Sequence, residues 1–313
     1  MNRIAFSAWL GCALVAGWLL GSRAPLQVSV VADADPALLT DDSAYMEAAY
    51  EPVSEAVVAQ LEQALYSEHT RLLDQLAQLQ PGIPGQPELF FLGIAGDGTQ
   101  RVFGREVDFV QQQLAQRYSL DGHSLLLIND RERIGTTAMA TRTSVWQALQ
   151  TLARQMNPDE DVLLLYLTTH GSEDHYLMLD QEGMLLPDLA AEELSAWLDD
   201  SGIRWQVVIL SACFSGGAVP LLRHPDRLVM TSAAADRSSF GCTDDADLTY
   251  FGRALFEQAF AVEADWPAMF DHASRWIEQR EAQEEMTPSL PQLAAGERIL
   301  QQLAQLPRQE ATP

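Results

Sequence analysis

The chain contains few basic residues. Only 19 lysines and arginines stand against 44 aspartates and glutamates in 313 residues, which gives a formal net charge of −25. A protein that binds nucleic acid needs a basic surface to contact the phosphates, and the sequence has no cluster that could provide one. The composition therefore argues against nucleic acid as a partner and favours neutral or basic partners.

Cysteine is also scarce, with three in the whole chain. Cys12 lies in an apolar N-terminal segment, which leaves Cys213 and Cys242 for the rest of the protein. Two cysteines are too few for a disulfide framework. Apolar residues make up 47% of the composition, which is ample for a hydrophobic core.

Motifs for metal ions and organic cofactors are lacking. His170 and His175, with Glu173 and Asp174 between them, do not have the His-Glu-x-x-His spacing of a zinc site, and no second cluster supplies further ligands. We therefore expect neither a metal nor a cofactor, and we interpret the acidic stretch after His170 as a solvated loop.

The N-terminus carries a long apolar run. Residues 4–20 are apolar and follow Arg3. A run of this length is typical of a signal peptide or of a minimal membrane anchor, and the flanking arginine favours a cytoplasmic N-terminus and an exported remainder. A cleavage motif is poorly placed, so we favour an uncleaved anchor within residues 1–22. The predicted location is periplasmic, with tethering to the inner membrane through this segment.

The rest of the chain divides into three parts. Residues 23–87 are predicted to form an acidic linker and then an amphipathic helix, because leucine and valine recur at helical spacing between Val57 and Leu79. The proline- and glycine-rich stretch from 81 to 87 ends that helix. The main domain is predicted over residues 88–265, and residues 266–313 are predicted to form a helical tail.

Apolar stretches of strand length alternate with helical patterns in the main domain. Strands are predicted over residues 89–94, 124–128, 162–169, 205–212 and 227–231, and helices over 105–118, 144–156, 189–198 and 250–260. Uniformly apolar strands are typical of a sheet that is buried on both faces. The alternation predicts an α/β fold with a doubly wound, mostly parallel sheet and helices on both faces.

Two of these strands end in chemically reactive residues. One runs into His170-Gly171, and the other runs into Cys213. Because a helix lies in the connection between them, the two strands should be parallel, and parallel strands finish at the same edge of the sheet. We therefore expect His170 and Cys213 to emerge at neighbouring strand ends.

A thiol beside an imidazole is a candidate nucleophile. The base raises the thiolate fraction, and main-chain N–H groups at a tight turn can hold an oxyanion. Gly171 suits a place where a substrate carbonyl must approach the backbone. Either residue alone would be interpreted as an inert thiol or an ordinary histidine, but their pairing favours catalysis. Ser215 lacks the leading glycine of a Gly-x-Ser-x-Gly elbow, so we interpret it as a turn residue.

The sequences around these two residues resemble a known family. Tyr166–Gly171 (YLTTHG) and Ser211–Gly216 (SACFSG) are similar to the two motifs of the legumain-type cysteine peptidases, family C13 of clan CD. The resemblance covers about residues 89–260 and implies a caspase-like α/β fold. It also implies that His170 is the catalytic histidine, that Cys213 is the nucleophile, and that the N–H groups of Gly171 and Cys213 form the oxyanion hole.

The substrate pocket departs from the family pattern. An asparagine that supports the histidine in the family is replaced by Val102, and the pocket arginine falls at a glycine, with Arg105 one position later. The residue after the nucleophile is Phe214, where the family usually has glutamate, and Asp245 stands at an acidic pocket position. The resemblance thus assigns Arg105, Phe214 and Asp245 to the pocket and leaves asparagine specificity open.

Two classes of function are compatible with these observations. The first is a cysteine endopeptidase that cleaves peptides or proteins through an acyl-enzyme, in a family that also catalyses transpeptidation. The second is a catalytically silent caspase-like module that binds a peptide and scaffolds an envelope complex. A thiol acyltransferase that uses the same two residues is a third and weaker alternative.

Overall fold

The computed structural model describes residues 53–309. The apolar run at residues 4–20 and the chain up to residue 52 lie outside the described residues, and so does the end of the tail. Within residues 53–309, no helix combines the length and the apolar character needed to cross a membrane.

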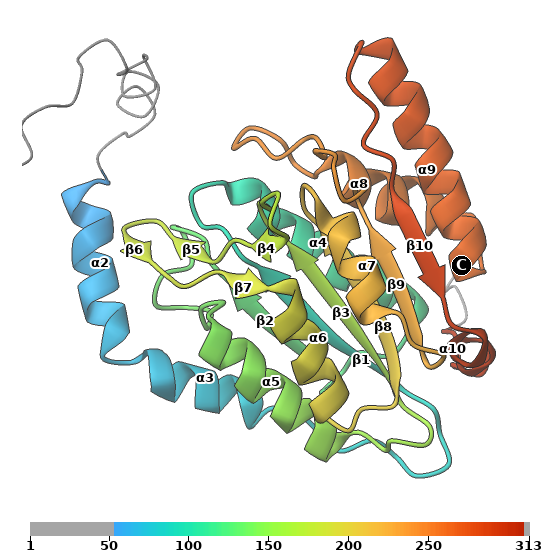
Figure 1. The fold of residues 1–313 in the computed structure, drawn as a ribbon. Helices are drawn as coiled ribbons and strands as arrows, with labels where there is room; N and C mark the ends of the chain where they lie inside the picture. The colour runs from blue at the N-terminus through green and yellow to red at the C-terminus, as the bar shows by residue number, and fades with distance from the viewer. Residues whose placement is uncertain (1–52, 310–313) are drawn as a thin grey trace, which may run out of the picture. The chain divides into compact units, whose positions relative to one another are not determined.

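One central sheet organises the described part of the chain, with its strands in the order β10-β9-β8-β3-β1-β2 (Figure 1). Neighbouring strands are parallel except that β10 runs antiparallel to β9. The mostly parallel α/β sheet predicted from the sequence is confirmed. The strands of this sheet are β1 (Leu89–Ala95), β2 (Ser124–Ile128), β3 (Val162–Thr168), β8 (Trp205–Ser211), β9 (Arg227–Thr231) and β10 (Gln292–Ala295).

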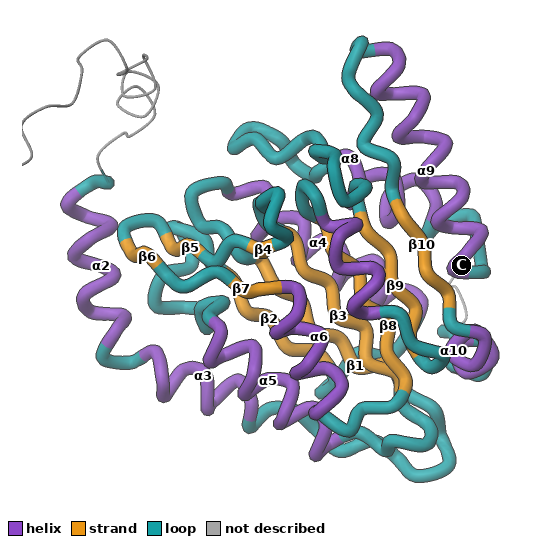
Figure 2. Tube along the Cα trace, viewed as in Figure 1, coloured by secondary structure: helices purple, strands orange, loops and turns teal. Residues whose placement is uncertain are grey.

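Helices cover both faces of the sheet (Figure 2). Along β3, Leu164 and Tyr166 belong to one hydrophobic core and Leu163 and Leu165 to the other, because successive strand residues point to opposite faces. The first core is completed by α4 (Arg101–Arg117), α8 (Tyr250–Gly252) with the π-helical segment Arg253–Ala259, α9 (Trp266–Gln283) and α10 (Glu297–Leu303). The second core is completed by α3 (Glu68–Leu76), α5 (Arg142–Gln155), α6 (Ala191–Asp200) and α7 (Val219–Leu222).

The predicted N-terminal helix is divided into two helices that pack on the main domain. Helix α2 (Glu55–Leu65) begins at Ser54, whose side chain accepts the N–H of Val57. Helix α3 follows it, and the Gln75 side chain both donates to the Leu126 carbonyl and accepts from the Ala138 N–H. These contacts tie the helical segment to β2 and to the loop after it, rather than leaving it as a free stalk.

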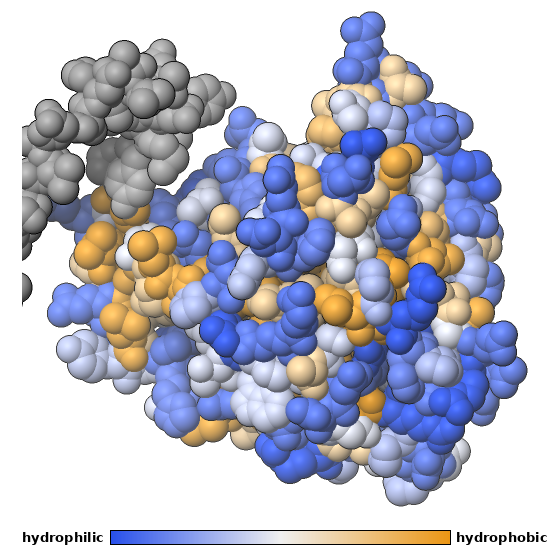
Figure 3. All heavy atoms as spheres, viewed as in Figure 1, coloured by the Kyte–Doolittle hydropathy of each residue, from blue (hydrophilic) through white to orange (hydrophobic). Residues whose placement is uncertain are grey.

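Apolar side chains are exposed near α2. Tyr66 is 88% exposed at the break between α2 and α3, and Leu185 is 92% exposed on a small hairpin. The space-filling view shows hydrophobic side chains over this part of the surface (Figure 3).

Two short antiparallel strand pairs, one nested inside the other, occupy the connection between β3 and α6, for which the sequence predicted a loop and an earlier helix start. Strand β4 (Tyr176–Leu177) pairs with β7 (Leu189–Ala190), and β5 (Asp180–Gln181) pairs with β6 (Met184–Leu185). A two-residue strand is too short to show the alternation on which strand prediction depends. These strand pairs begin shortly after His170, with β4 at Tyr176. They therefore lie close to the carboxyl end of β3.

The tail also differs from its prediction. Helices α9 and α10 confirm its helical character, but between them β10 pairs with β9, with Gln292 opposite Thr231. This four-residue edge strand contains one strongly apolar residue, Leu293, so its sequence carries little strand signal. Residues 292–295 are therefore part of the central sheet.

Candidate active site

The register of β3 against β8 places the two predicted catalytic residues at corresponding positions along neighbouring strands. The paired residues run from Val162 opposite Trp205 to Thr168 opposite Ser211. The Thr169 N–H donates to the Ser211 carbonyl at 3.1 Å and continues the ladder by one step. His170 and Cys213 each stand two residues beyond the last pair, at the carboxyl ends of adjacent parallel strands.

Gly171 lies directly against the turn that carries Cys213. A Cβ atom at this position would overlap the Cys213 carbonyl oxygen, so only glycine allows this approach. Gly171 also forms an isolated antiparallel bridge with Leu177, and the Met178 N–H donates to the His170 carbonyl at 3.0 Å. The hairpin after β3 thereby holds the His-Gly segment against Cys213.

The sulfur of Cys213 is half-buried and faces Ser239. The Ser239 N–H donates to Sγ at 3.3 Å, and the Ser239 carbonyl lies 3.6 Å from Sγ. The next residue, Phe214, has a left-handed backbone with φ of +57°, and its N–H donates to the Arg237 carbonyl. A short 3₁₀ turn over Ser215–Ala218 then leads into α7. The thiol thus sits on a sharp turn, beside a donor that can stabilise negative charge on sulfur.

The imidazole of His170 is half-buried and packs edge-on against the Phe103 ring, with 5.1 Å between the ring centroids. Among residues 53–309, no side chain donates to or accepts from its ring nitrogens. Val102 is fully buried in α4 and offers no polar atom, as the sequence comparison with the family anticipated. Aromatic packing is therefore the contact that orients this ring.

A buried polar layer lies beneath the strand ends, and the sequence analysis missed it. The Glu106 carboxyl is fully buried and accepts the Tyr166 hydroxyl and the Thr249 N–H, each at 2.6 Å. The Ser211 and Thr249 hydroxyls lie 3.2 Å apart. Burial raises the pKa of Glu106, although the hydrogen bonds from Tyr166 and Thr249 oppose this effect. Glu106 lies on the same face of α4 as the apolar residues that recur at helical spacing. The sequence therefore did contain a signal that Glu106 is buried.

The structure does not bring the three predicted pocket residues into one pocket. Arg105 donates to the Asp244 carbonyl and lines a pocket of about 320 Å³ that is shared with Asp247 and Arg253. Asp245 is exposed, and neither it nor Phe214 lines that pocket.

A larger pocket of about 570 Å³ lies next to the segment that contacts Cys213. Ser239, the residue that contacts the sulfur, forms part of its lining. The other lining side chains are mainly aromatic or apolar and come from the segment after β9 and from the α9 region: Phe240, Cys242, Leu248, Tyr250, Trp276 and Met286, with Arg253 and Arg280. Its size and lining are typical of a site for an apolar group.

Cys242, the second cysteine of the described chain, belongs to this pocket and is chemically unlike a nucleophile. Burial, reinforced by the proximity of Cys213, raises the pKa of Cys242 to about 11. Its thiol is therefore protonated at neutral pH.

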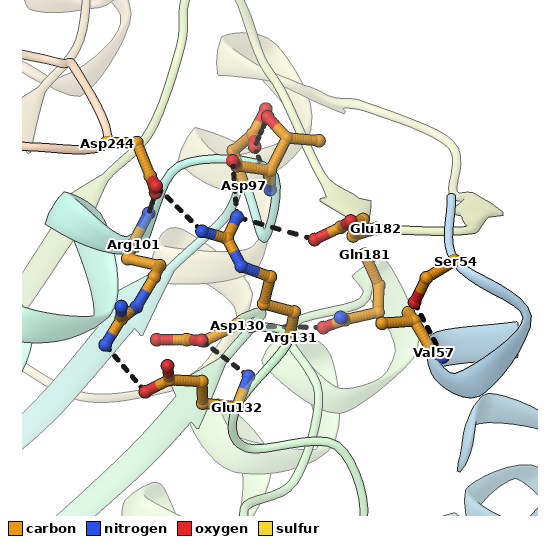
Figure 4. A network of polar contacts seen from close by, with 11 residues as sticks. Ser54, Val57, Asp97, Arg101, Asp130, Arg131, Glu132, Gln181, Glu182 and Asp244 are labelled. Carbon is orange, nitrogen blue, oxygen red and sulfur yellow. Dashed lines mark hydrogen bonds and ion pairs between the residues drawn. The ribbon is translucent and has the colours of Figure 1, made fainter. Parts of the chain in front are cut away.

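A network of charges fastens the pocket segment to the loops after β1 and β2 (Figure 4). The Asp244 carboxylate accepts the Arg101 N–H at 2.9 Å and pairs with the Arg131 guanidinium at 2.7 Å. Arg131 also pairs with Glu182 at 3.5 Å. Partial burial raises the pKa of Asp244, but the hydrogen bonds from Arg101 and Arg131 outweigh this effect and lower it below the usual range. Asp244 is thus the ionised anchor of the segment that contacts Cys213.

Across residues 53–309, histidine, cysteine and acidic side chains form no group of three suited to hold a metal ion. His175 lies beside the nucleophile turn rather than in a ligand set with His170.

Comparisons with known proteins show what part of this chain is similar to a described family. No curated protein matches the chain. Among solved structures, caspase-1 from Spodoptera frugiperda is similar at 14% identity, with 67% of this chain and 87% of the caspase chain covered and a TM-score of 0.49. A family model described as the peptidase C13 family matches residues 155–301, the stretch that carries both strand ends. Residues 155–301, which include the ends of β3 and β8, are therefore similar to the peptidase C13 family.

Proposed function

We propose that the protein is a cysteine endopeptidase of the legumain type, with Cys213 as nucleophile and His170 as acid and base. The observation that carries the proposal is the shared level of these residues at the ends of β3 and β8, with Gly171 against the Cys213 main chain. The similarity of residues 155–301 to the peptidase C13 family supports a cysteine peptidase and, with it, peptide or protein substrates.

The proposed reaction has two steps, acylation of Cys213 and hydrolysis of the resulting thioester. His170 accepts the proton of the Cys213 thiol, and the sulfur attacks the scissile carbonyl carbon. The carbonyl oxygen gains the negative charge, and the N–H groups of Gly171 and Cys213 are the donors that would hold it. The C–N bond then breaks, the amine leaves with the proton from His170, and a thioester remains on Cys213. Water attacks the thioester and transfers a proton to His170, so that the acid product and the free thiol are released.

The 570 Å³ pocket gives this proposal a substrate preference. A peptide whose carbonyl lies at Cys213 passes Ser239, so a side chain close to the scissile bond can enter the pocket that Ser239 helps to line. Three aromatic rings (Phe240, Tyr250 and Trp276) favour a bulky apolar side chain there.

The test uses the full-length protein and a peptide library varied around the cut. Cys213→Ala and His170→Ala should abolish cleavage, whereas Cys242→Ala should leave cleavage intact because its thiol is protonated and buried. Mass spectrometry of wild-type protein mixed with substrate should detect an acyl group on Cys213. Full activity in Cys213→Ala would dispose of the proposal.

One observation keeps the silent module as a second candidate. The His170 ring lacks a polar partner in the described residues, and Val102 cannot supply one. That candidate expects peptide binding without cleavage, and equal peptide affinity in wild-type and Cys213→Ala protein.

The location is part of the same proposal. The apolar run at residues 4–20 favours an exported protein, periplasmic and held at the inner membrane. Cell fractionation, followed by treatment of intact spheroplasts with an external protease, tests this location.

A further inference from the structure

The turn that carries Cys213 is in contact with a second imidazole, that of His175. The sequence analysis assigned this residue to a solvated loop, but its side chain is half-buried. Its Nδ1 lies 3.2 Å from the Phe214 carbonyl oxygen. A carbonyl oxygen can only accept, so the contact requires the proton on Nδ1.

Both partners of this contact have an unusual backbone. The φ angle is +61° at His175 and +57° at Phe214, and within residues 53–309 Glu285 and Leu290 are the other non-glycine residues with a positive φ. For a bulky residue such as Phe214 this conformation is unfavourable. Such conformations persist where the surroundings enforce them, and they gather at functional sites. Here two of them touch at the nucleophile turn.

The ring also packs against the far end of the same turn. A Cβ atom added to Gly217 would overlap Nδ1, Cε1 and Nε2 of His175, which are the three atoms nearest to it. The imidazole therefore lies against the α-carbon of Gly217 while it reaches the carbonyl of Phe214. One ring spans the turn that follows Cys213.

Main-chain hydrogen bonds also fix the loop that carries His175. The His175 N–H donates to the Ser172 carbonyl at 2.9 Å, and the Ala191 N–H donates to the His175 carbonyl at 3.3 Å. The loop begins at Gly171, which lies against the Cys213 carbonyl. The segment after His170 thus contacts the nucleophile turn at two places, near its start through Gly171 and near its end through His175.

We propose that His175 is a positioning residue for the nucleophile, an inference that rests on the peptidase function proposed above. Its ring makes no hydrogen bond to the Cys213 sulfur, whose polar partners in the described residues all belong to Ser239. His175 acts through the main chain of Phe214 and Gly217. These contacts keep the turn in the conformation that places Cys213 for reaction with His170. Without the ring, Phe214 is free to return to a negative φ, and the thiol moves away from the imidazole of His170.

Three substitutions at position 175 separate the effect of the imidazole ring from the effect of the backbone conformation. His175→Asn keeps a donor and tolerates a positive φ, His175→Gly keeps the backbone freedom without a ring, and His175→Leu loses the donor and disfavours the conformation. A displacement of the order of 1 Å costs about 100-fold in rate, so kcat should fall about 100-fold in the Gly and Leu variants with KM little changed. His175→Asn should stay within about threefold of wild type because it restores the donor at the same φ.

Gly217→Ala tests the same contact by changing the residue against which the His175 ring packs. The added methyl group must displace the ring, so this variant should lose activity as His175→Gly does. The double variant Gly217→Ala with His175→Gly should be no worse than Gly217→Ala alone, because residues that act through one contact are not additive. The matched control is His272→Leu on α9, a half-buried imidazole that pairs with Glu263 and should leave kcat unchanged.

A second readout does not depend on peptidase activity. The rate at which iodoacetamide alkylates Cys213, followed by peptide mass spectrometry, should fall about tenfold in His175→Leu and His175→Gly and recover in His175→Asn, since thiolate content depends on the nearby base. If wild-type protein cleaves no peptide, the proposed function fails while this series still decides the role of His175. Wild-type kcat and alkylation in His175→Leu, an Asn variant as poor as the Leu variant, or additive losses in the double variant would each overturn the inference.

Discussion

The main-chain N–H of Ser239 points at the sulfur of Cys213 from 3.3 Å. Ser239 lies 26 positions later in the chain, on the segment that Asp244 anchors to Arg101 and Arg131. Cys213 is therefore held from two sides, by its own turn and by a distant segment that also lines the apolar pocket.

Removing this N–H should slow the reactions of the thiol. Ser239→Pro has no main-chain N–H, whereas Ser239→Ala keeps it. Because a hydrogen bond to an anionic sulfur favours the thiolate, we expect about tenfold slower alkylation of Cys213 by iodoacetamide at pH 7 in Ser239→Pro. Ser239→Ala should match wild type, and equal rates in the two variants would contradict the assigned contact.

The two cysteines of the described chain should differ in reactivity. Burial raises the pKa of Cys242 to about 11, so its thiolate fraction at pH 7.5 is of the order of 10⁻³ or less. Brief iodoacetamide treatment at this pH should label Cys213 and spare Cys242, and the two peptides are distinguished by mass spectrometry. Rapid labelling of Cys242 in Cys213→Ala protein would show that the thiol is not protected as the structure indicates.

The apolar pocket should control substrate choice. Trp276→Ala enlarges it and removes an aromatic wall, so kcat/KM should fall about tenfold or more for peptides with a bulky apolar residue close to the scissile bond. Peptides with a small residue there should be affected much less. The control is Trp197→Ala, in a pocket between α5 and α6. An equal loss for large and small side chains would argue against selection by this pocket.

Asp180 should make stability depend on pH. Burial raises its pKa to about 6, with contributions from Asp97, Asp188 and Glu182. The native state therefore binds more protons than the unfolded state between about pH 4 and pH 6. The stabilising effect of protonation is fully present below pH 4 and is lost as the pH rises through 6.

Substitution of Asp180 tests this prediction. Asp180→Asn removes the cost of the charge, and after allowance for solvent screening it should raise the free energy of unfolding by about 1 kcal/mol at pH 7. At pH 4 the variant and wild type should be alike. Urea denaturation at both pH values provides the measurement, and the same gain at both would contradict the raised pKa.

The strand ends could be predicted because the relevant information is local. Strands β3 and β8 are continuous apolar runs, and glycine follows each reactive residue within a few positions. Parallel pairing then follows from the helix in the connection. No knowledge of distant contacts was needed to predict that His170 and Cys213 follow the ends of neighbouring parallel strands.

The walls of the site could not be predicted in this way. The apolar pocket combines Phe240 and Tyr250 with Trp276 and Met286, which meet because α9 packs against α8 and the π-helical segment that follows it. Family resemblance pointed to Arg105, Phe214 and Asp245, which the structure distributes over different surroundings. His175 gave no sequence signal, because its contact with Gly217 depends on a left-handed backbone that the sequence does not specify.

The pairing of Thr168 with Ser211 also limits how the length of this chain can vary. A single residue inserted into β3 or β8 would turn every later side chain of that strand to the opposite face. Two inserted residues would restore the face but shift one reactive group by about 6.6 Å along the strand. Only matched insertions in both strands keep His170 and Cys213 at corresponding positions beyond the Thr168–Ser211 pair, so the lengths of β3 and β8 constrain each other.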